Sequence, residues 1–343
     1  MNAPTSQISA CPDRVPGAWH AFDEIDIDGV AQALHGVATH TALHAIELDD
    51  PRIELRLKLE NRQETGAFKA RGAWNQVRLL QPAEKAAGVV GCSSGNHGKA
   101  LAWAAKRAGV AATIVMPHDS YPNKIQACRD LGANVVLSES RRAADDDCAA
   151  LVADGMKLVH PYDAENTVAG AGTVGLEIAH DWPAVEVVVI PVGGGGLISG
   201  SSLALRRRLG DSITILGAEP TGAANMTLAL AAGKPVDLDE ITTKVQGLCP
   251  MNAGDLNVRI ARTTLDGVVT LPDELIFATQ AWLVAAGEVV EPAGAAAPAV
   301  AYHAVLPERL LAGRSKDDPL RVAAVVSGGN PDPAQLAALR ANA

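Results

Sequence analysis

A lysine with unusually small neighbours stands in the stretch ETGAFKARGA, residues 64–73. Lys69 follows Phe68, and most of the surrounding residues are glycine or alanine. A lysine that forms a Schiff base must lose its proton, which desolvation promotes, and it must let a flat carbonyl compound approach closely. The small residues leave that clearance, and Phe68 is available to pack on the ring of such a compound or on the core. An ordinary surface lysine after a turn is the open alternative.

Three glycine-rich segments have the composition of ligand-binding loops. They read CSSGNHGKA (92–100), PVGGGGLISG (191–200) and VVSGGNPDP (325–333). Gly193–Gly196 follow an apolar run and precede a helix-period segment, so their N–H groups can wrap a phosphate at the positive end of a helix. No Gly-Lys-Ser/Thr follows these glycines, which excludes a P-loop. A mobile loop is the alternative, but four glycines in that place cost conformational entropy.

A competing signal is GAGTVG, residues 170–175, which matches the dinucleotide fingerprint G-x-G-x-x-G. The fingerprint requires a strand immediately before it. The preceding segment HPYDAENTVA is polar and turn-like. A nicotinamide site therefore has weak support, and an NAD(P)-dependent dehydrogenase stays an alternative of another class.

The elements that must position these residues alternate in type along the chain. Apolar, β-branched runs occur at 86–92, 111–117, 133–138 and 185–192, and helix-period segments occur at 98–109, 123–133 and 197–210. Continuous apolar strands separated by helices are typical of parallel sheets covered on both faces. The sequence therefore predicts an α/β fold, whose ligands collect where the carboxyl ends of strands lead into helices.

Composition excludes several classes of function. The 343 residues are 48% hydrophobic and 20% charged, which predicts one large or two modest globular domains. A net charge of -10 and an aromatic content of 3% argue against a nucleic-acid partner. Five cysteines without a C-x-x-C pair fit reduced thiols. No signal peptide or apolar run of about 18 residues is present, so we expect a cytoplasmic protein with no membrane partner.

Five motifs occur in a familiar order between about residue 40 and residue 332: ENRQETGAFKARGA, SSGNHG, GGGGL, EPAGA and SGGN. In this order and spacing they resemble the fold type II pyridoxal-phosphate (PLP) enzymes, and look most like the serine/threonine dehydratase and serine racemase group. The resemblance implies two open, mostly parallel twisted sheets flanked by helices. It also implies a large PLP-binding domain (1–87 and 165–343), a small mobile domain (88–164), an active site between them, and a homodimer.

The resemblance also implies roles for individual residues. Lys69 would hold the cofactor covalently and remove the substrate Cα proton, and Phe68 would cover one face of the ring. Asn96 would bond the ring hydroxyl, and Ser327 would face the pyridine nitrogen. The remaining cofactor contacts would come from the phosphate loop, Gly193, Gly194, Gly195, Gly196 and Leu197. The substrate carboxylate would bind the loop of Ser93, Ser94, Gly95, Asn96 and His97, a helix N-terminus. Ser94 is a candidate acid/base on the ring face opposite Lys69.

The activity that follows from the resemblance is α,β-elimination of water from a β-hydroxy L-amino acid, giving a 2-oxo acid and ammonia. A serine facing the pyridine nitrogen does not force that nitrogen to stay protonated, which favours elimination. A serine or aspartate racemase of the same fold is an alternative, and a catalytically silent ligand-binding protein is another.

Three positions depart from the family pattern: Ala67 replaces a serine, Ala171 a glutamine and Gln246 an acidic residue. In the family these positions lie near the cofactor or substrate, so we expect a specialised small-molecule substrate, of hydroxyaspartate type or of hydroxyectoine-utilisation type. Arg141 and Arg142 are candidates to meet a second carboxylate, and a solvated charge pair is the alternative.

The family's divalent-cation site maps by position to Glu219, Ala223 and Asn225, so Mg²⁺ or another divalent cation is a candidate second cofactor. The third ligand has lost its charge, which weakens the site, and a plain surface turn is the alternative. Eleven residues follow Asp332. Without room for a C-terminal regulatory domain, we expect a catabolic role.

Overall fold

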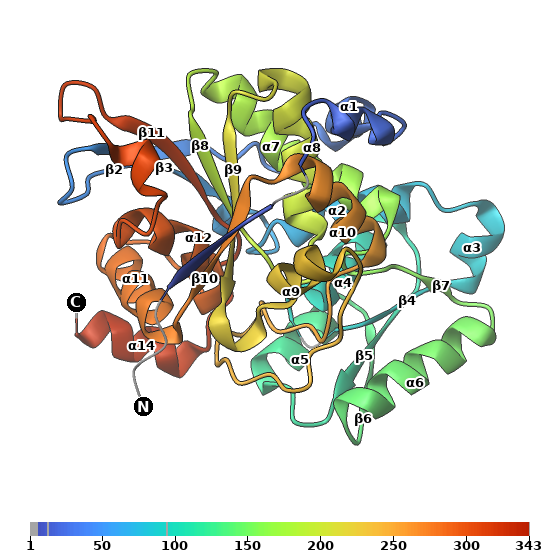
Figure 1. Cartoon of the computed structure of the whole chain (residues 1–343). Helices are drawn as coiled ribbons and strands as arrows, with labels where there is room; N and C mark the ends of the chain where they lie inside the picture. Colours follow the sequence, from blue (N-terminus) through green and yellow to red (C-terminus); the bar gives the residue numbers. More distant parts are fainter. Residues whose placement is uncertain (1–5, 12–13, 94, 343) are drawn as a thin grey trace.

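The computed structural model describes residues 6–11, 14–93 and 95–342, and the elements below lie within these ranges. Two sheets organise the chain (Figure 1). The larger sheet has seven strands in the order β1-β10-β9-β8-β11-β3-β2, and the smaller has four in the order β6-β5-β4-β7. The predicted α/β fold of two mostly parallel sheets flanked by helices is confirmed.

The larger sheet is parallel in its centre and antiparallel at both edges, where β1 pairs with β10 and β2 with β3. Its strands are β1 (Gln7–Ala10), β2 (Leu43–Ile46), β3 (Ile53–Leu59), β8 (Val187–Pro191), β9 (Thr214–Pro220), β10 (Gly267–Leu271) and β11 (Leu320–Val326). The predicted run 185–192 is thus β8.

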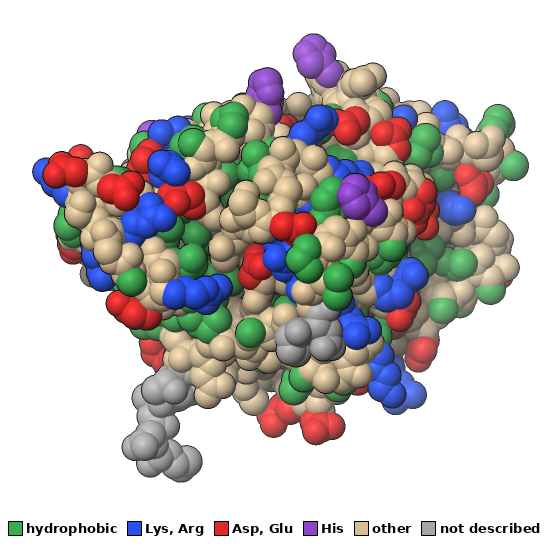
Figure 2. Space-filling view, turned by 45° about the horizontal axis from the view of Figure 1, so that its top comes forward, with side chains coloured by type: hydrophobic (Ala, Val, Ile, Leu, Met, Phe, Trp, Pro, Cys, Tyr) green, Lys and Arg blue, Asp and Glu red, His purple; other side chains and the backbone are tan. Residues whose placement is uncertain are grey.

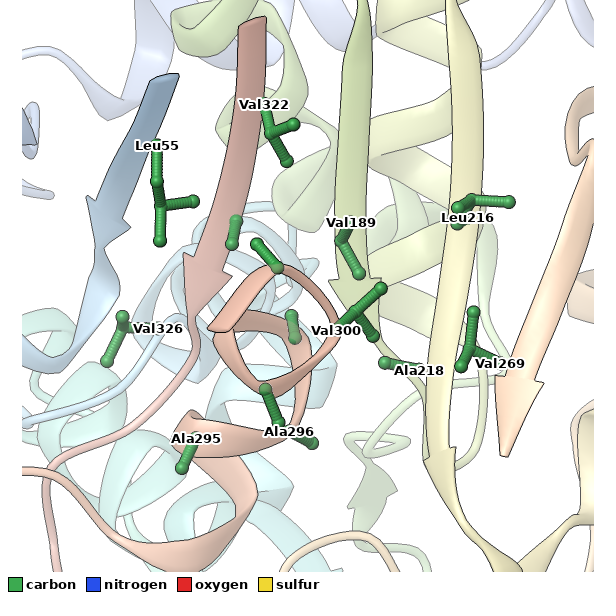
Figure 3. Close-up of a cluster of buried hydrophobic side chains, with 14 of the residues drawn as sticks. Leu55, Val189, Leu216, Ala218, Val269, Ala295, Ala296, Val300, Val322 and Val326 are labelled. Carbon is green, nitrogen blue, oxygen red and sulfur yellow. The ribbon is translucent and has the colours of Figure 1, made fainter. Parts of the chain in front are cut away.

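Alternate residues of these strands enter two hydrophobic cores, one on each face of the sheet. Figure 3 shows the first core, where Ala296 and Val300 of α12 (Pro292–Tyr302) pack against Val189 and Val322. Helices α11 (Asp273–Ala285) and α13 (Glu308–Leu311) contribute to this core. The second core lies under α7 (Glu165–Asp181), α8 (Gly196–Leu209), α9 (Asn225–Ala232) and α10 (Asp255–Thr264). Burial on both faces explains the continuous apolar runs in these strands.

The smaller sheet is wholly parallel and lies between Val89 and Leu158. Its strands are β4 (Val89–Cys92), β5 (Ala112–Pro117), β6 (Asn134–Ser138) and β7 (Lys157–Leu158), and its helices are α4 (Asn96–Ala108), α5 (Pro122–Asp130) and α6 (Arg141–Ala153). Each corresponds to an apolar or helix-period run in the sequence, apart from α6 and the two-residue β7. The domain boundaries at 87/88 and 164/165 stay a prediction.

The remaining helices connect and cover the two sheets. They are α1 (Ile27–Leu34), α2 (Lys69–Arg78), α3 (Pro82–Ala87) and α14 (Pro333–Ala341), with short 3-10 turns at Ala18–Phe22, Glu60–Arg62 and Thr221–Ala223. Acidic and basic side chains are interspersed over the face in Figure 2. Among the described residues, no helix has both the length and the apolar character needed to cross a membrane.

The GAGTVG segment lies in the middle of helix α7, not in a loop after a strand. Its glycines let α7 approach neighbouring helices closely. A Cβ on Gly170 would stand 2.6 Å from the Cα of Gly72 in α2, and one on Gly175 would stand 2.2 Å from the carbonyl oxygen of Ser201 in α8. These glycines are packing residues, so the segment offers no dinucleotide-binding loop.

We expect the same constraint to make Gly200 of α8 intolerant of any side chain. A Cβ there would stand 2.0 Å from the carbonyl oxygen of Val168, so Gly200→Ala must separate α7 from α8. We expect a loss of about 3 kcal/mol in the free energy of unfolding, measured by urea denaturation. Gly287→Ala is the control, because it has φ 93° and no atom within 4 Å. This control should lose only about 1 kcal/mol through backbone strain. Equal losses in the two variants would contradict the packing argument.

Candidate active site

A cleft of about 1060 Å³ contains the residues expected to do chemistry, and its walls come from both sheets. Three loops reach it from the carboxyl ends of β4, β8 and β11, as expected for ligand sites in parallel sheets. The described members of the predicted cofactor and substrate sites all line it: Phe68, Lys69, Ser93, Gly95, Asn96, His97, Gly193, Gly194, Gly195, Gly196, Leu197 and Ser327. Ser94 lies outside the described residues.

Lys69 is the first residue of α2 and has no carboxylate partner among the described residues. Its Nζ donates a hydrogen bond to the carbonyl oxygen of Pro161 at 2.6 Å. It also lies 5.0 Å from the ring centroid of Phe68. Desolvation lowers the pKa of Lys69 to about 8 because no anion compensates for the buried charge. A substantial fraction of this amine is therefore neutral, and hence nucleophilic, near physiological pH.

The glycine loop presents unoccupied hydrogen-bond donors to the cleft. Among the described residues, no hydrogen bond uses the backbone N–H of Gly193, Gly194 or Gly195. Gly195 has φ 95°, a conformation that favours glycine, and it precedes the first turn of α8. A Cβ on Gly194 would stand 2.3 Å from the ring of Tyr162, which packs directly on the loop. Free N–H groups at a helix N-terminus form an anion-binding site.

The loop before α4 combines a helix N-terminus with the half-buried amide of Asn96. Gly95 donates its backbone N–H to the Ser93 hydroxyl at 3.2 Å. Asn96, the first residue of α4, accepts from Asn330 at 2.8 Å and donates its side-chain amide to Glu291. The His97 imidazole faces Val159, with Nε2 2.8 Å from that carbonyl oxygen. Burial lowers the pKa of His97 to about 3, so its side chain is neutral.

Ser327 directly follows β11 and is buried against α12. Its hydroxyl donates to the carbonyl oxygen of Ala293 at 3.4 Å, and its own carbonyl accepts from the N–H of Phe68 at 3.1 Å. The second bond ties the end of β11 to the residue before Lys69. Lys69 and Ser327 are therefore held on one wall of the cleft.

The three departures from the family pattern do not share one environment. Only Gln246 lines the cleft; Ala67 is buried against Gly328, and Ala171 is buried in α7. Neither alanine therefore lines the cleft, although the family pattern predicts both positions near the cofactor or substrate. Arg141 does line the cleft and donates to the carbonyl oxygen of Cys249 at 3.2 Å, whereas Arg142 does not line it.

Sequence reasoning missed several side chains in the cleft. Glu291 lies beside Asn96, and burial raises the pKa of its carboxyl. Tyr162, Tyr121 and Lys124 also line the cleft. Glu291 is the first residue of the EPAGA motif, so the sequence could have identified it as a candidate site residue. Tyr121 and Tyr162 lie outside helices and strands, and Lys124 lies in the predicted helical segment 123–133, where no local pattern marks it as a site residue.

The candidate cation ligands lie at the N-terminus of α9. The carboxylate of Glu219 is buried and accepts from the N–H groups of Met226 at 3.1 Å and Thr227 at 3.0 Å. The amide of Asn225 donates to the carbonyl oxygen of Pro250 at 3.3 Å, and its own oxygen is buried without a partner. Within the part of the chain that the structure describes, no three His, Cys, Asp or Glu side chains cluster as metal ligands. An unpartnered oxygen beside a buried carboxylate is compatible with a weakly held cation.

Comparison with known proteins agrees with this geometry. Residues 37–328 match the family model for pyridoxal-phosphate dependent enzymes. The chain is 36% identical over 312 residues to the L-threonine ammonia-lyase of Thermotoga maritima, covering 90% of this chain and 75% of that protein. It is 36% identical over 282 residues to a serine racemase of Oryza sativa, covering 81% of each.

A solved structure, the processed threonine deaminase isoform 2 of Solanum lycopersicum, superposes with a TM-score of 0.86 at 29% identity, covering 100% of this chain and 94% of that one. The fold of this chain is thus shared over its whole length with a solved structure. The chain belongs to the family of pyridoxal-phosphate-dependent enzymes, in the group with fold type II.

We expect Lys69→Met to stabilise the cofactor-free protein by about 2 kcal/mol at pH 7, measured by chemical denaturation. Burial of the Lys69 ammonium destabilises the native state of the unaltered protein, because the same charge is hydrated in the unfolded chain. The native pKa is about 8 and the ordinary value is 10.5. This destabilisation is therefore fully present below about pH 8, and it disappears as the pH rises to about 10.5.

Lys106→Met on the exposed face of α4 is the matched control and should change stability little at any pH. A Lys69→Met variant with the same pH profile as the unaltered protein would contradict the burial argument.

Proposed function

We propose that the chain is a PLP-dependent dehydratase, or ammonia-lyase, that eliminates water from a β-hydroxy L-amino acid and yields a 2-oxo acid and ammonia. The observation that carries the proposal is the amine of Lys69, which has no anionic partner among the described residues and shares a cleft with the free N–H groups of the glycine loop. The similarity to ammonia-lyases over most of the chain supports it.

The cleft has the functional groups that PLP requires. Lys69 would bind the aldehyde carbon, Gly193–Gly196 and Leu197 the phosphate, and Phe68, Asn96 and Ser327 the ring. The unused N–H groups before α8 are the observation that favours a phosphate there. When bound, PLP withdraws electrons from the substrate Cα and so acidifies its proton.

Different residues of the chain then bind the substrate and accept its proton. The backbone N–H groups at the start of α4 bind the substrate carboxylate, together with Ser93, Ser94 and His97 of that loop. Neutral Lys69 accepts the Cα proton as general base, and the carbonyl oxygen of Pro161 orients its Nζ. Ser327 would be an uncharged partner for the ring nitrogen, which favours loss of the β-hydroxyl over reactions that need a long-lived carbanion. The β-hydroxyl leaves as water, and one water then hydrolyses the released unsaturated amino acid, so the net change converts the substrate to a 2-oxo acid and ammonia.

Racemisation is a second candidate, favoured by the identity with serine racemases. It needs an acid/base on the ring face opposite Lys69, the role we propose for Ser94. The substrate we infer is more polar or larger than threonine, since Gln246 and Arg141 supply hydrogen-bonding groups to the cleft wall. A homodimer in the cytoplasm is the assembly and location that we propose.

The experiment that tests the function mixes purified protein with PLP and records the visible spectrum. We expect an absorption band, and borohydride reduction followed by peptide mapping should place the label on Lys69. Ammonia release from a panel of L-serine, L-threonine, 3-hydroxyaspartate and phenylserine should fall by at least about 10³-fold in Lys69→Ala. The absence of a band, or label on another lysine, would overturn the proposal.

We further propose that Glu219, the carbonyl oxygen of Ala223 and Asn225 bind a divalent cation weakly. A single carboxylate gives low affinity, and an added charge should raise it. Asn225→Asp should therefore lower the Mg²⁺ concentration needed for half the maximal rise in Tm by about tenfold. Glu219→Gln should abolish the rise. If Mg²⁺ changed the Tm of neither the unaltered protein nor Asn225→Asp, the site would not exist.

A further inference from the structure

Lys124 is a cation in the cleft that the proposed reaction does not use. It stands in the first turn of α5 and is partly buried in the cleft wall. Among the described residues it forms no ion pair within 4 Å. The one hydrogen bond that its ammonium donates to a described residue is long, 3.4 Å from Nζ to Oε1 of Gln246. Most of the hydrogen-bonding capacity of this ammonium is therefore unused.

Two neighbours hold Lys124 in place without neutralising it. The amide of Gln246 donates to the hydroxyl of Tyr121 at 2.9 Å, across a separation of 125 residues in the chain. The ring of Tyr121 lies 5.6 Å from Nζ of Lys124. Because the amide and the phenol are both uncharged, the positive charge of Lys124 stays available to a ligand.

The charge of Lys124 acts toward the interior of the cleft. It is the largest influence that opposes the burial-driven rise in the pKa of Glu291, the carboxyl bonded to Asn96. No ion pair within 4 Å joins Glu291 to Lys124 among the described residues, and Oε1 of Glu291 accepts from the amide of Asn96. Lys124, Gln246 and the first residues of α4 line the same cleft. A substrate held by its α-carboxylate at the α4 N-terminus would extend its side chain into this cleft.

Gln246 also connects this rim to the glycine loop. The next residue, Gly247, has φ 95°, and its carbonyl oxygen would stand 3.3 Å from a Cβ on Gly193. Acidic side chains occur in the cleft lining as well, at Asp119, Glu139 and Asp145, and all three are exposed. They are screened by solvent more strongly than partly buried Lys124, which weakens their repulsion of an anion.

We propose that Lys124 is a specificity-determining residue that binds a second carboxylate on the substrate, with Tyr121 and Gln246 as its positioning residues. The substrate class is then a β-hydroxy amino acid that carries a carboxylate on Cβ. This inference rests on the proposed function and narrows it. A methyl group in the same position, as in threonine, leaves Lys124 without a ligand and gains no charge-assisted hydrogen bond.

The test uses the PLP-loaded protein and two ligands without a β-leaving hydroxyl, L-aspartate and L-asparagine. The side chains of these two ligands have nearly the same shape, but only that of L-aspartate is charged. The dissociation constant of each ligand is measured from the shift of the cofactor absorption band. We expect the unaltered protein to bind L-aspartate at least about tenfold more tightly than L-asparagine. Lys124→Met should reduce this ratio to about one, and Gln246→Glu should reduce it as well, because the new carboxylate occupies Lys124.

Arg129→Met is the matched control, since it removes an exposed cation from the same helix outside the cleft lining, and it should keep the full ratio. In turnover, Lys124→Met should lower kcat/KM for 3-hydroxyaspartate by at least about tenfold more than for L-threonine.

Each result points to one conclusion. Failure of the protein to form a cofactor band refutes the proposed function itself. A band with equal affinity for the two ligands in the unaltered protein overturns the inference alone, and so does a Lys124→Met variant that keeps the preference. An equal loss for both ligands would show that Lys124 is merely structural and would also overturn it.

Discussion

A buried ionic network fixes the helix that begins with Lys69. Arg71, two residues further along α2, bonds Glu60 at 2.8 Å and Glu177 at 2.6 Å, while Lys58 of β3 reaches Glu177 at 2.5 Å. These groups join α2 to β3 and to α7, on the side of the helix away from the cleft. Removal of one partner from such a network typically costs about 3–5 kcal/mol because it leaves an uncompensated buried charge. The position of the Lys69 amine therefore depends on charges that do not line the cleft.

The two walls of the cleft are joined by apolar as well as polar contacts. On the large-sheet side, the loops after β8 and β11 rest on cores in which nearly every side chain is fully buried. The opposite wall packs on α2 through a third core, which Ala70 and Val77 of α2 share with residues of α4. Asn330 adds polar contacts, with Asn96 at 2.8 Å and with Lys99 at 2.9 Å. The helix that begins with Lys69 is therefore packed against the smaller-sheet side as well as bonded to the larger sheet.

Local signals in the sequence predicted β4, β5, β6 and β8 and the helices α4, α5 and α8, because continuous apolar strands and helical periodicity are properties of neighbouring residues. They did not predict α6 or the two-residue β7. Tertiary neighbours were not predictable in this way. Arg141 and Arg142 have the same local context, yet successive residues on a helix point about 100° apart, so only Arg141 reaches the cleft. The glycines of GAGTVG fit a ligand-binding motif by letter, whereas their function is to let α7 pack against α2 and α8. The hydrogen bond between Tyr121 and Gln246 could not be predicted from local signals, because 125 residues separate the two along the chain.

The antiparallel strand β1 completes one edge of the larger sheet. Its four residues pair with β10 through the register from Gln7 with Thr270 to Ala10 with Gly267. Without β1, the apolar strand of Val268 and Val269 would present unpaired backbone groups to other chains, a template for intermolecular strand addition. With β1 in place, the outer strand is only four residues long and carries the polar Gln7 and Ser9, so this edge is a poorer template than β10 would be. Fusion tags and truncations of this enzyme should leave residues 7–10 in place.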